Sequence, residues 1–480
     1  MSATPLRQAG LAAAAHPGVR VPRYDRGALE PRIAHIGVGG FVRSHLALYT
    51  ENVAAQGGAW GIAGIGSRRE DAAIASALTR QDGLYTLIEK GPGEPSVAII
   101  GSVLSVRHAP PGADAAMTEA IAAATTAILS LTITEAGYAE PSAGTPTTFD
   151  RIAAALRVRR DRGAGPLTIL SLDNIPANGT VTRRATLAAA ERLGGGLTSW
   201  IDGHCRFPDS MVDRITPATS DADRTWLREA RGLDDAWPVV AEPFRQWVLE
   251  DDFAAGRPAW ERDGALFSDR VGDWERYKLR LLNAGHSSMA YLASLAGLTY
   301  VDEAMADPTL RALVERLLRV EALPTLAEIP GHPREAYLAT VLERFASRGI
   351  RDQLHRVCQD GSAKLPTFLI PTVVAQLQRD GPIVCAATAL AGWARYLAVT
   401  APGDQAFDAS GATARVHAAA AVDDPRAFLE YGAVFPPELR DDERFSAAFA
   451  EAYRRVAEDG PLAACVRAAA GDATRSQLPR

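Results

Sequence analysis

The N-terminal half of the chain alternates short apolar runs with amphipathic segments. Apolar runs of the length of buried strands occupy residues 33–36, 60–66, 85–89, 97–103, 127–134 and 167–172. Segments with helical spacing of apolar residues follow the first two runs, at 43–54 and after 71. Because strands that alternate with helices form parallel sheets covered by helices, we expect an α/β fold for this half.

The C-terminal half has helical periodicity almost throughout. Apolar residues recur at i, i+3 and i+4 in segments separated by Gly or Pro: 274–296, 302–306, 310–320, 333–346, 351–359, 370–379, 383–399 and 445–457. Strand patterns almost vanish after about residue 269. The pattern therefore predicts an N-terminal arm (1–30), an α/β domain (31–268) and a mainly α-helical domain (269–480).

Composition excludes several classes of function. The 480 residues suffice for two or three cores, and a formal net charge of −6 without a long basic run argues against nucleic acid as a partner. No stretch approaches the roughly 18 apolar residues of a membrane span. The four cysteines form no CxxC pair, and the apolar run before His16 is too brief for a signal peptide. We expect a soluble, cytoplasmic protein that does not associate with membranes.

Lysine is rare in this chain. Of the 51 basic residues only Lys90, Lys278 and Lys364 are lysines, which leaves 48 arginines. A lysine is required where an amine must lose its proton, because guanidinium stays protonated in proteins. Drift in a codon-biased gene is the alternative explanation, so position has to distinguish a functional lysine from a neutral one.

A glycine-rich turn follows the first predicted strand. The turn Gly37-Val38-Gly39-Gly40-Phe41 lies between that strand and a predicted helix, where backbone N–H groups receive the pyrophosphate of a dinucleotide. The third glycine of the GxGxxG fingerprint would fall at Val42, and glycine turns also occur for purely conformational reasons. The turn is a candidate cofactor site with that alternative open.

The end of the second predicted strand carries charges of both signs. Arg68 and Arg69 precede Glu70 and Asp71, where a Rossmann-type domain meets the adenosine ribose. An arginine there accepts the 2′-phosphate of NADP, whereas an acid favours NAD. We count Arg68 and Arg69 as cofactor-binding candidates, although all four residues could simply begin a solvated helix.

Lys278, Asn283 and His286 open the helical domain. At ~100° per residue on an α-helix, Asn283 lies ~140° and His286 ~80° round from Lys278, so all three can reach one broad face. Burial of that face would help the lysine to lose its proton. An amine that accepts a proton, with neutral donors beside it, suits the oxidation of an alcohol. The alternative is a packed helix with a core histidine and a snorkelling lysine.

Asn174 follows a buried strand at the edge of the sheet where ligands bind in α/β proteins. It could supply a second amide, although the surrounding Asn, Pro and Gly residues also suit an ordinary turn. The strand exit at 134–138 is equally ambiguous. Zinc motifs (Gly-His-Glu, HExxH) and a tyrosine followed four residues later by lysine are all missing from the sequence, so metal-free lysine chemistry remains.

The ordered motifs together resemble the mannitol dehydrogenase family, the polyol-specific long-chain dehydrogenases. They are the Gly37 turn, 134–138, 173–179, 213–217, 247–251 and 278–287, and they cover nearly the whole chain. The resemblance implies a Rossmann-type N-terminal domain, a mainly helical C-terminal domain and no metal. It departs from the family at Val42, where the family usually has histidine before the arginine.

The resemblance also implies roles for individual residues. Lys278 would be the general base, Asn174 and Asn283 the amides that stabilise the oxyanion, and His286 a group that orients the substrate. Further positions would contact the substrate or lie beside the lysine: Asp213, Arg356, Lys364 and Glu275.

The expected activity is hydride transfer between an open-chain polyol and NAD, with NADP as the weaker alternative. D-Mannitol and D-fructose are the leading substrate pair, so the expected partners are small polyols or ketoses. A hexuronate reductase, an arabinitol or sorbitol dehydrogenase, and a non-catalytic dinucleotide sensor are the alternatives. The sequence does not indicate an oligomeric state and is compatible with a monomer.

Overall fold

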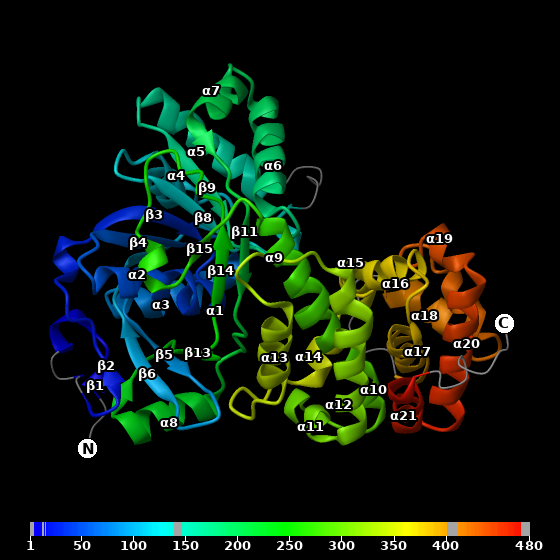
Figure 1. Ribbon diagram of the computed structural model, residues 1–480. Coiled ribbons are helices and arrows are strands. Elements are labelled where there is room, and N and C mark those ends of the chain that lie inside the picture. Colours follow the sequence, from blue (N-terminus) through cyan, green and yellow to red (C-terminus); the bar gives the residue numbers. More distant parts are fainter. Residues whose placement is uncertain (1–3, 12–13, 15, 139–145, 401–410, 472–480) are drawn as a thin grey trace. The chain divides into compact units, whose positions relative to one another are not determined.

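The computed structural model describes residues 4–11, 14, 16–138, 146–400 and 411–471. The chain forms two compact units, Met1–Gly272 and Asp273–Arg480 (Figure 1). The first unit combines strands with helices, and the described part of the second is built from helices. The predicted fold class is therefore confirmed.

A six-stranded sheet organises the first unit. Its strand order is β10-β9-β8-β3-β4-β7, and every pairing is parallel. The chain adds β4 and β7 on one side of β3, then returns to the other side with β8, which is the Rossmann order. The switch between β3 and β8 is where such sheets bind ligands. The strands are β3 (Glu30–Ile36), β4 (Trp60–Gly66), β7 (Val103–His108), β8 (Ile128–Leu131), β9 (Leu167–Ser171) and β10 (Cys205–Arg206).

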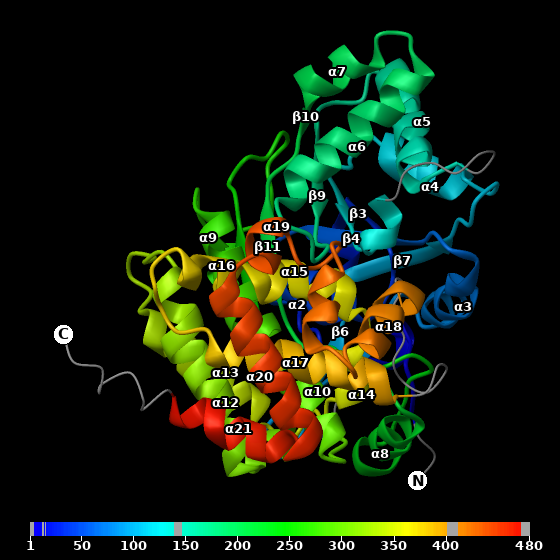
Figure 2. The same cartoon turned by 90° about the vertical axis from the view of Figure 1, so that its right-hand side faces the viewer.

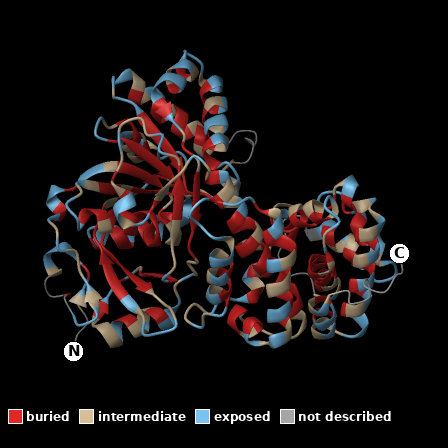
Figure 3. Cartoon of the chain, in the orientation of Figure 1, coloured by how far each residue is buried: buried red, intermediate tan, exposed pale blue. Residues whose placement is uncertain are grey.

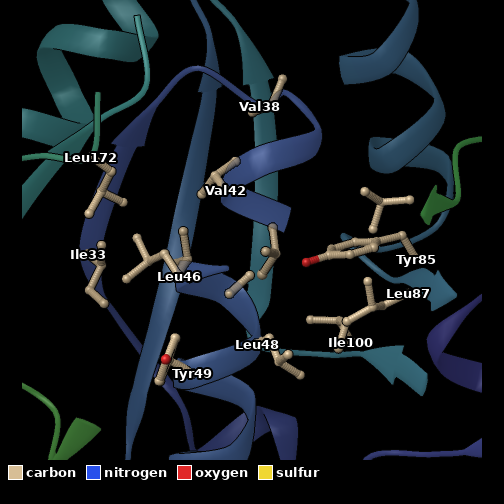
Figure 4. Close-up of a cluster of buried hydrophobic side chains, with 14 of the residues drawn as sticks. Ile33, Val38, Val42, Leu46, Leu48, Tyr49, Tyr85, Leu87, Ile100 and Leu172 are labelled. Carbon is tan, nitrogen blue, oxygen red and sulfur yellow. The ribbon is translucent and has the colours of Figure 1, made fainter. Parts of the chain in front are cut away.

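Each face of this sheet is covered, because successive side chains of a strand point to opposite faces. Ile33 packs into one core and Ala34 into the other. The Ala34 core includes residues of α4 (Ala115–Ala122), α5 (Thr148–Asp161), α6 (Asn178–Leu193) and α7 (Leu197–His204). The Ile33 core includes residues of α1 (Gly40–Ser44), α2 (Leu46–Ala54) and α3 (Ala72–Arg80). Figure 4 shows Val38 and Val42 in the same core as Ile33 and Tyr85.

Two further sheets and one strand pair lie beside the predicted parallel sheet, and the strands predicted at 85–89 and 97–103 belong to one of these sheets. One sheet, β13-β5-β6-β2, contains an antiparallel pair, β5 (Tyr85–Glu89) with β6 (Ser96–Ile100), between β13 (Val239–Ala241) and β2 (Val19–Arg20). The other sheet joins β11 (Ser210–Asp213), β14 (Gln246–Leu249) and β15 (Leu266–Phe267), and β1 (Thr4–Pro5) pairs with β12 (Leu233–Asp234). Parts of the expected arm thus belong to sheets, because two-residue strands are too short to show a period in the sequence.

The second unit packs around α17 (Val384–Val399). This helix is buried on nearly all sides and contacts α10 (Ala284–Leu295) and α20 (Glu443–Glu458) (Figures 2 and 3). The other helices are α9 (Val271–Tyr277), α11 (Val301–Ala306), α12 (Pro308–Arg316), α13 (Arg334–Phe345), α14 (Leu354–Cys358), α15 (Gly361–Phe368), α16 (Ile370–Leu377), α18 (Gly411–Ala420), α19 (Pro437–Arg440) and α21 (Pro461–Ala470). Among the described helices of the chain, none is long and apolar enough to cross a membrane.

Candidate active site

The turn after β3 accepts only glycine at its first position. Gly37 has a φ of +100°, and a Cβ there would lie 2.2 Å from the carbonyl oxygen of Thr132. Gly39 differs, because its φ is −64° and no described atom lies within 4 Å of the place that its Cβ would take. The backbone at Gly39 is therefore open to a ligand that approaches closely, as a pyrophosphate does.

Side chains behind the turn hold it in place. Val38 is buried in the core, so it can offer a ligand only its backbone. Arg43 turns inward, and its Nε donates to the carbonyl groups of Val38 (3.3 Å) and Gly39 (3.2 Å). Phe41 stacks on His45, with 4.9 Å between ring centroids. The sequence predicted one helix over 43–54, but the structure has a break at His45. The break occurs where the His45 ring packs against Trp247 in the aromatic core.

Of the four charged residues after β4, only Asp71 is buried. Asp71 is buried, and its carboxylate accepts hydrogen bonds from the backbone N–H of Arg68 (3.0 Å) and from Nη2 of Arg68 (2.9 Å). Arg69 and Glu70 are exposed. Arg68 is thus paired with an acid of its own loop while 68% of its side chain stays exposed, so the exposed charges here are two arginines and one glutamate.

The exits of β8 and β9 brace each other. The carboxylate of Asp173 accepts hydrogen bonds from the Thr134 N–H (2.8 Å) and the Tyr138 hydroxyl (2.9 Å). Thr134 has a φ of +62°, so this contact stabilises an uncommon backbone conformation. The amide of Asn178 donates to the carbonyl of Asp173 (3.1 Å). Asn174 is exposed and stands on a loop fixed at both sides.

The segment with Lys278 is not a continuous α-helix. Residues Lys278–Asn283 form a π-helix, η6, between α9 and α10. Hydrogen bonds of a π-helix join residues five apart, so Lys278 and Asn283 lie on the same side of η6. The α-helical angle of ~140° between them was wrong. Lys278 is buried with 9% of its surface exposed, and Asn283 is half-buried.

His286 on α10 faces a cluster of charged side chains from α15 and the start of α14. Its Nε2 lies 3.6 Å from Oδ2 of Asp352, and its ring stacks on Phe345 with 4.9 Å between centroids. Nε of Arg356 donates to Oδ1 of Asp352 at 2.8 Å. Burial lowers the pKa of His286 to about 4, and the charges of Arg356 and Lys364 add to the lowering. The imidazole is therefore neutral at neutral pH.

Two other candidate residues occupy separate positions. Asp213 ends β11 and is buried with 3% of its surface exposed. It acts on His45, whose pKa burial lowers to about 3 and the charge of Asp213 partly restores. Glu275 lies on α9, three residues before Lys278, and is half-buried. The described residues contain no group of three His, Cys, Asp or Glu side chains that could hold a metal ion.

Comparison with protein families identifies the chain. The family model described as "Mannitol dehydrogenase Rossmann domain" matches residues 31–262, and "Mannitol dehydrogenase C-terminal domain" matches residues 270–457. The chain belongs to the mannitol dehydrogenase family. The family resemblance read from the sequence motifs is thereby confirmed.

Curated members of the mannitol dehydrogenase family align along nearly the whole chain. Mannitol dehydrogenase 2 of Saccharomyces cerevisiae is 38% identical and covers 92% of this chain and 93% of its own length. Mannitol 2-dehydrogenase of Aspergillus fumigatus is 38% identical and covers 94% of this chain and 95% of its own.

Solved structures agree with the sequence relatives. Pseudomonas fluorescens mannitol 2-dehydrogenase, in a ternary complex with NAD and D-mannitol, matches with a TM-score of 0.86 and 37% identity, over 96% of this chain and 99% of that one. A D-sorbitol dehydrogenase in substrate-free form matches with a TM-score of 0.86 and 31% identity, over 96% and 100%.

In this mannitol dehydrogenase family member, the structure joins two of the predicted residues to one that sequence analysis missed. His286 and Arg356 lie beside Asp352, and the charge of Lys364 acts on His286. The spacing of Asp352 and Arg356, four residues apart, suggests an ion pair. Nothing in the local sequence connects that pair with His286.

Proposed function

We propose that this mannitol dehydrogenase family member oxidises D-mannitol to D-fructose with NAD, and catalyses the reverse reduction. The observation that carries the proposal is the pair Lys278 and Asn283 on one side of a buried π-helix. An amine that can accept a proton, beside an amide that can donate a hydrogen bond, is what oxidation of a secondary alcohol requires.

The turn at Gly37 to Phe41 fits a dinucleotide. The strand order places it at the switch point of the sheet, and the open backbone at Gly39 leaves room for a pyrophosphate. Val38 and Gly40 contribute their backbone to the same turn, and the ring of Phe41 stacks on His45. When bound there, NAD supplies the acceptor for the hydride that leaves the carbinol carbon.

Lys278 takes the proton of the substrate hydroxyl. The amine accepts a proton only when neutral, a state that an arginine at this position would not reach. The amide of Asn283 donates a hydrogen bond to the same oxygen as negative charge develops on it. Asn174, on the braced loop after β9, supplies the second amide in this proposal.

The cluster on the second unit binds the rest of the polyol chain. Neutral His286 can accept a hydrogen bond, whereas Arg356 and Lys364 donate only, so together they suit a row of hydroxyl groups. Asp213 adds an acceptor on the first unit, and Glu275 contributes a carboxylate near Lys278. None of these roles requires a metal ion.

A substrate panel followed by nicotinamide absorbance tests the proposal. We expect the highest kcat/KM in oxidation with D-mannitol and NAD, and in reduction with D-fructose and NADH. D-Sorbitol deserves its place in the panel because the solved D-sorbitol dehydrogenase has the same fold. Better reduction of a hexuronate than of D-fructose would assign a hexuronate reductase, and NADH binding without turnover of any polyol would assign a sensor. EDTA should leave the activity unchanged.

A further inference from the structure

A single buried carboxylate serves two of the proposed substrate-binding residues. The side chain of Asp352 is 6% exposed. One oxygen accepts a hydrogen bond from Nε of Arg356 at 2.8 Å, and the other accepts from Nη2 of the same guanidinium and faces Nε2 of His286 at 3.6 Å. Two side chains from different helices therefore depend on one carboxylate for their orientation.

The backbone on both sides of Asp352 is anchored. Its carbonyl accepts a hydrogen bond from the N–H of Val301 at 2.9 Å, and the next residue, Gln353, forms a β-bridge with Tyr300. Arg351 has a φ of +53°, and its guanidinium lies 3.8 Å over the ring of Tyr300. Because this backbone is anchored, the Asp352 carboxylate has a fixed position. His286 and Arg356 therefore orient themselves relative to Asp352.

The contact with Asp352 determines which ring nitrogen of His286 carries the proton. Its Nε2 is buried and has no hydrogen-bond partner among the described residues, with the Asp352 carboxylate as its nearest acidic neighbour. The other charged groups that act on the ring, Arg344, Arg356 and Lys364, are cations. A carboxylate favours a proton on the nitrogen that faces it, which leaves Nδ1 with its lone pair as an acceptor.

The Asp352 carboxylate also fixes the plane of the Arg356 guanidinium. A fork of two parallel N–H···O bonds sets both the position and the plane of a guanidinium. The Arg356 side chain remains 52% exposed, so its outer edge is accessible while its inner edge is held. Burial opposes ionisation of Asp352, but its neighbours His286 and Arg356 outweigh burial and hold the Asp352 pKa below its usual range.

We propose that Asp352 is a positioning residue for polyol binding, which fixes the tautomer of His286 and the plane of Arg356. The inference rests on the proposed function, in which both partners contact the hydroxyl groups of the substrate. Asp352 itself need not contact the substrate.

Asp352→Asn tests the proposal, because asparagine keeps the shape and removes the charge. We expect KM for D-mannitol to rise at least about 10-fold, with a smaller change in kcat and unchanged affinity for NADH, since a charge-assisted fork is lost. In a cycle with Arg356→Ala, the double variant should lose less than the product of the two single losses.

Asp302→Asn is the matched control. Asp302 is equally buried, with 4% of its side chain exposed, and it pairs with Arg351 at 3.9 Å in the same anchored region. The control should leave KM for D-mannitol unchanged. An unchanged KM in Asp352→Asn, or the same KM rise in both variants, would overturn the proposal.

A second test measures the tautomer of His286 directly, without an activity assay. Histidine nitrogen chemical shifts, with the His286 signals identified through His286→Asn, should show the Nε2-protonated tautomer in the majority at neutral pH. A majority of the Nδ1-protonated form would contradict the proposal. If the wild type turns over no polyol, the proposed function fails by itself, and a smaller share of the Nε2-protonated form in Asp352→Asn than in the wild type still decides whether Asp352 orients His286.

Discussion

Gly37→Ala perturbs the proposed cofactor turn at its most crowded point. The new Cβ would lie 2.2 Å from the Thr132 carbonyl oxygen and 2.7 Å from the Thr132 hydroxyl. Carbon and oxygen atoms need about 3.2 Å, so the turn has to move by roughly 1 Å. The alanine must also adopt the φ of +100° that glycine has here.

The cost of this substitution follows from the contacts of the turn. A positive φ costs an alanine about 1–2 kcal/mol. The displacement loosens the hydrogen bond from the Gly37 N–H to the Ile65 carbonyl (2.9 Å) and that from the Thr132 hydroxyl to the Gly37 carbonyl (3.0 Å). Each is worth about 1 kcal/mol, so we expect a loss of about 3–4 kcal/mol. In a unit of this size that corresponds to a decrease in Tm of roughly 6–15 °C.

Gly39→Ala is the control within the same turn, because its Cβ meets no described atom within 4 Å. Thermal unfolding followed by circular dichroism should show a Tm within about 2 °C of wild type for this variant. NADH titration should show a Kd at least about 10-fold higher, because the methyl group occupies the approach of the pyrophosphate. A Tm of Gly37→Ala within about 2 °C of wild type would refute the steric argument. An unchanged NADH affinity in Gly39→Ala would refute the placement of the pyrophosphate.

Three further predictions concern the base, the cofactor and a buried acid. Lys278→Ala should lower kcat for polyol oxidation at least about 10³-fold at unchanged NADH affinity, and Lys278→Arg should not restore it; near-normal turnover in either variant would remove Lys278 from the mechanism. Steady-state kinetics should show a preference for NAD with measurable NADP activity, and Arg69→Glu should strengthen that preference; a more than about 10-fold preference of the wild type for NADP would contradict our interpretation of this loop. Burial raises the pKa of Glu321 to about 7, against the ordinary 4.5. The native state thus binds more protons than the unfolded state between these values, so the contribution of Glu321 to stability is complete below about pH 4.5 and is lost, by up to about 3 kcal/mol, as the pH rises through 7. The Tm advantage of wild type over Glu321→Gln should therefore narrow from pH 5 to pH 8, and a constant difference would count against this assignment.

Elements with a local pattern could be predicted from the amino-acid sequence. The strands with Ile33, Ile62, Ile128 and Leu170 are long enough to show an apolar run, and the glycine turn after the first of them marks the switch point of the sheet. Long helices such as α17 and α20 were predicted within about two residues of their ends. The order of the motifs was sufficient to identify the family, because motifs depend on residue identity and spacing alone.

Features that depend on contacts between distant segments could not be predicted from the sequence. The residues of the π-helix at Lys278–Asn283 would suit an α-helix equally well. The packing of the surrounding helices selects the π-helix. The two-residue strands of the arm are stabilised by partner strands far along the chain, so no local periodicity in the sequence predicts them.

The same reason explains why Asp352 escaped sequence analysis. Its hydrogen bonds to Arg356 are local, but its contact with His286 exists only because α10 and α14 pack together. Residue type and spacing predict which side chains can perform the chemistry. Which neighbour orients them depends on long-range packing, and that is a property of the folded chain.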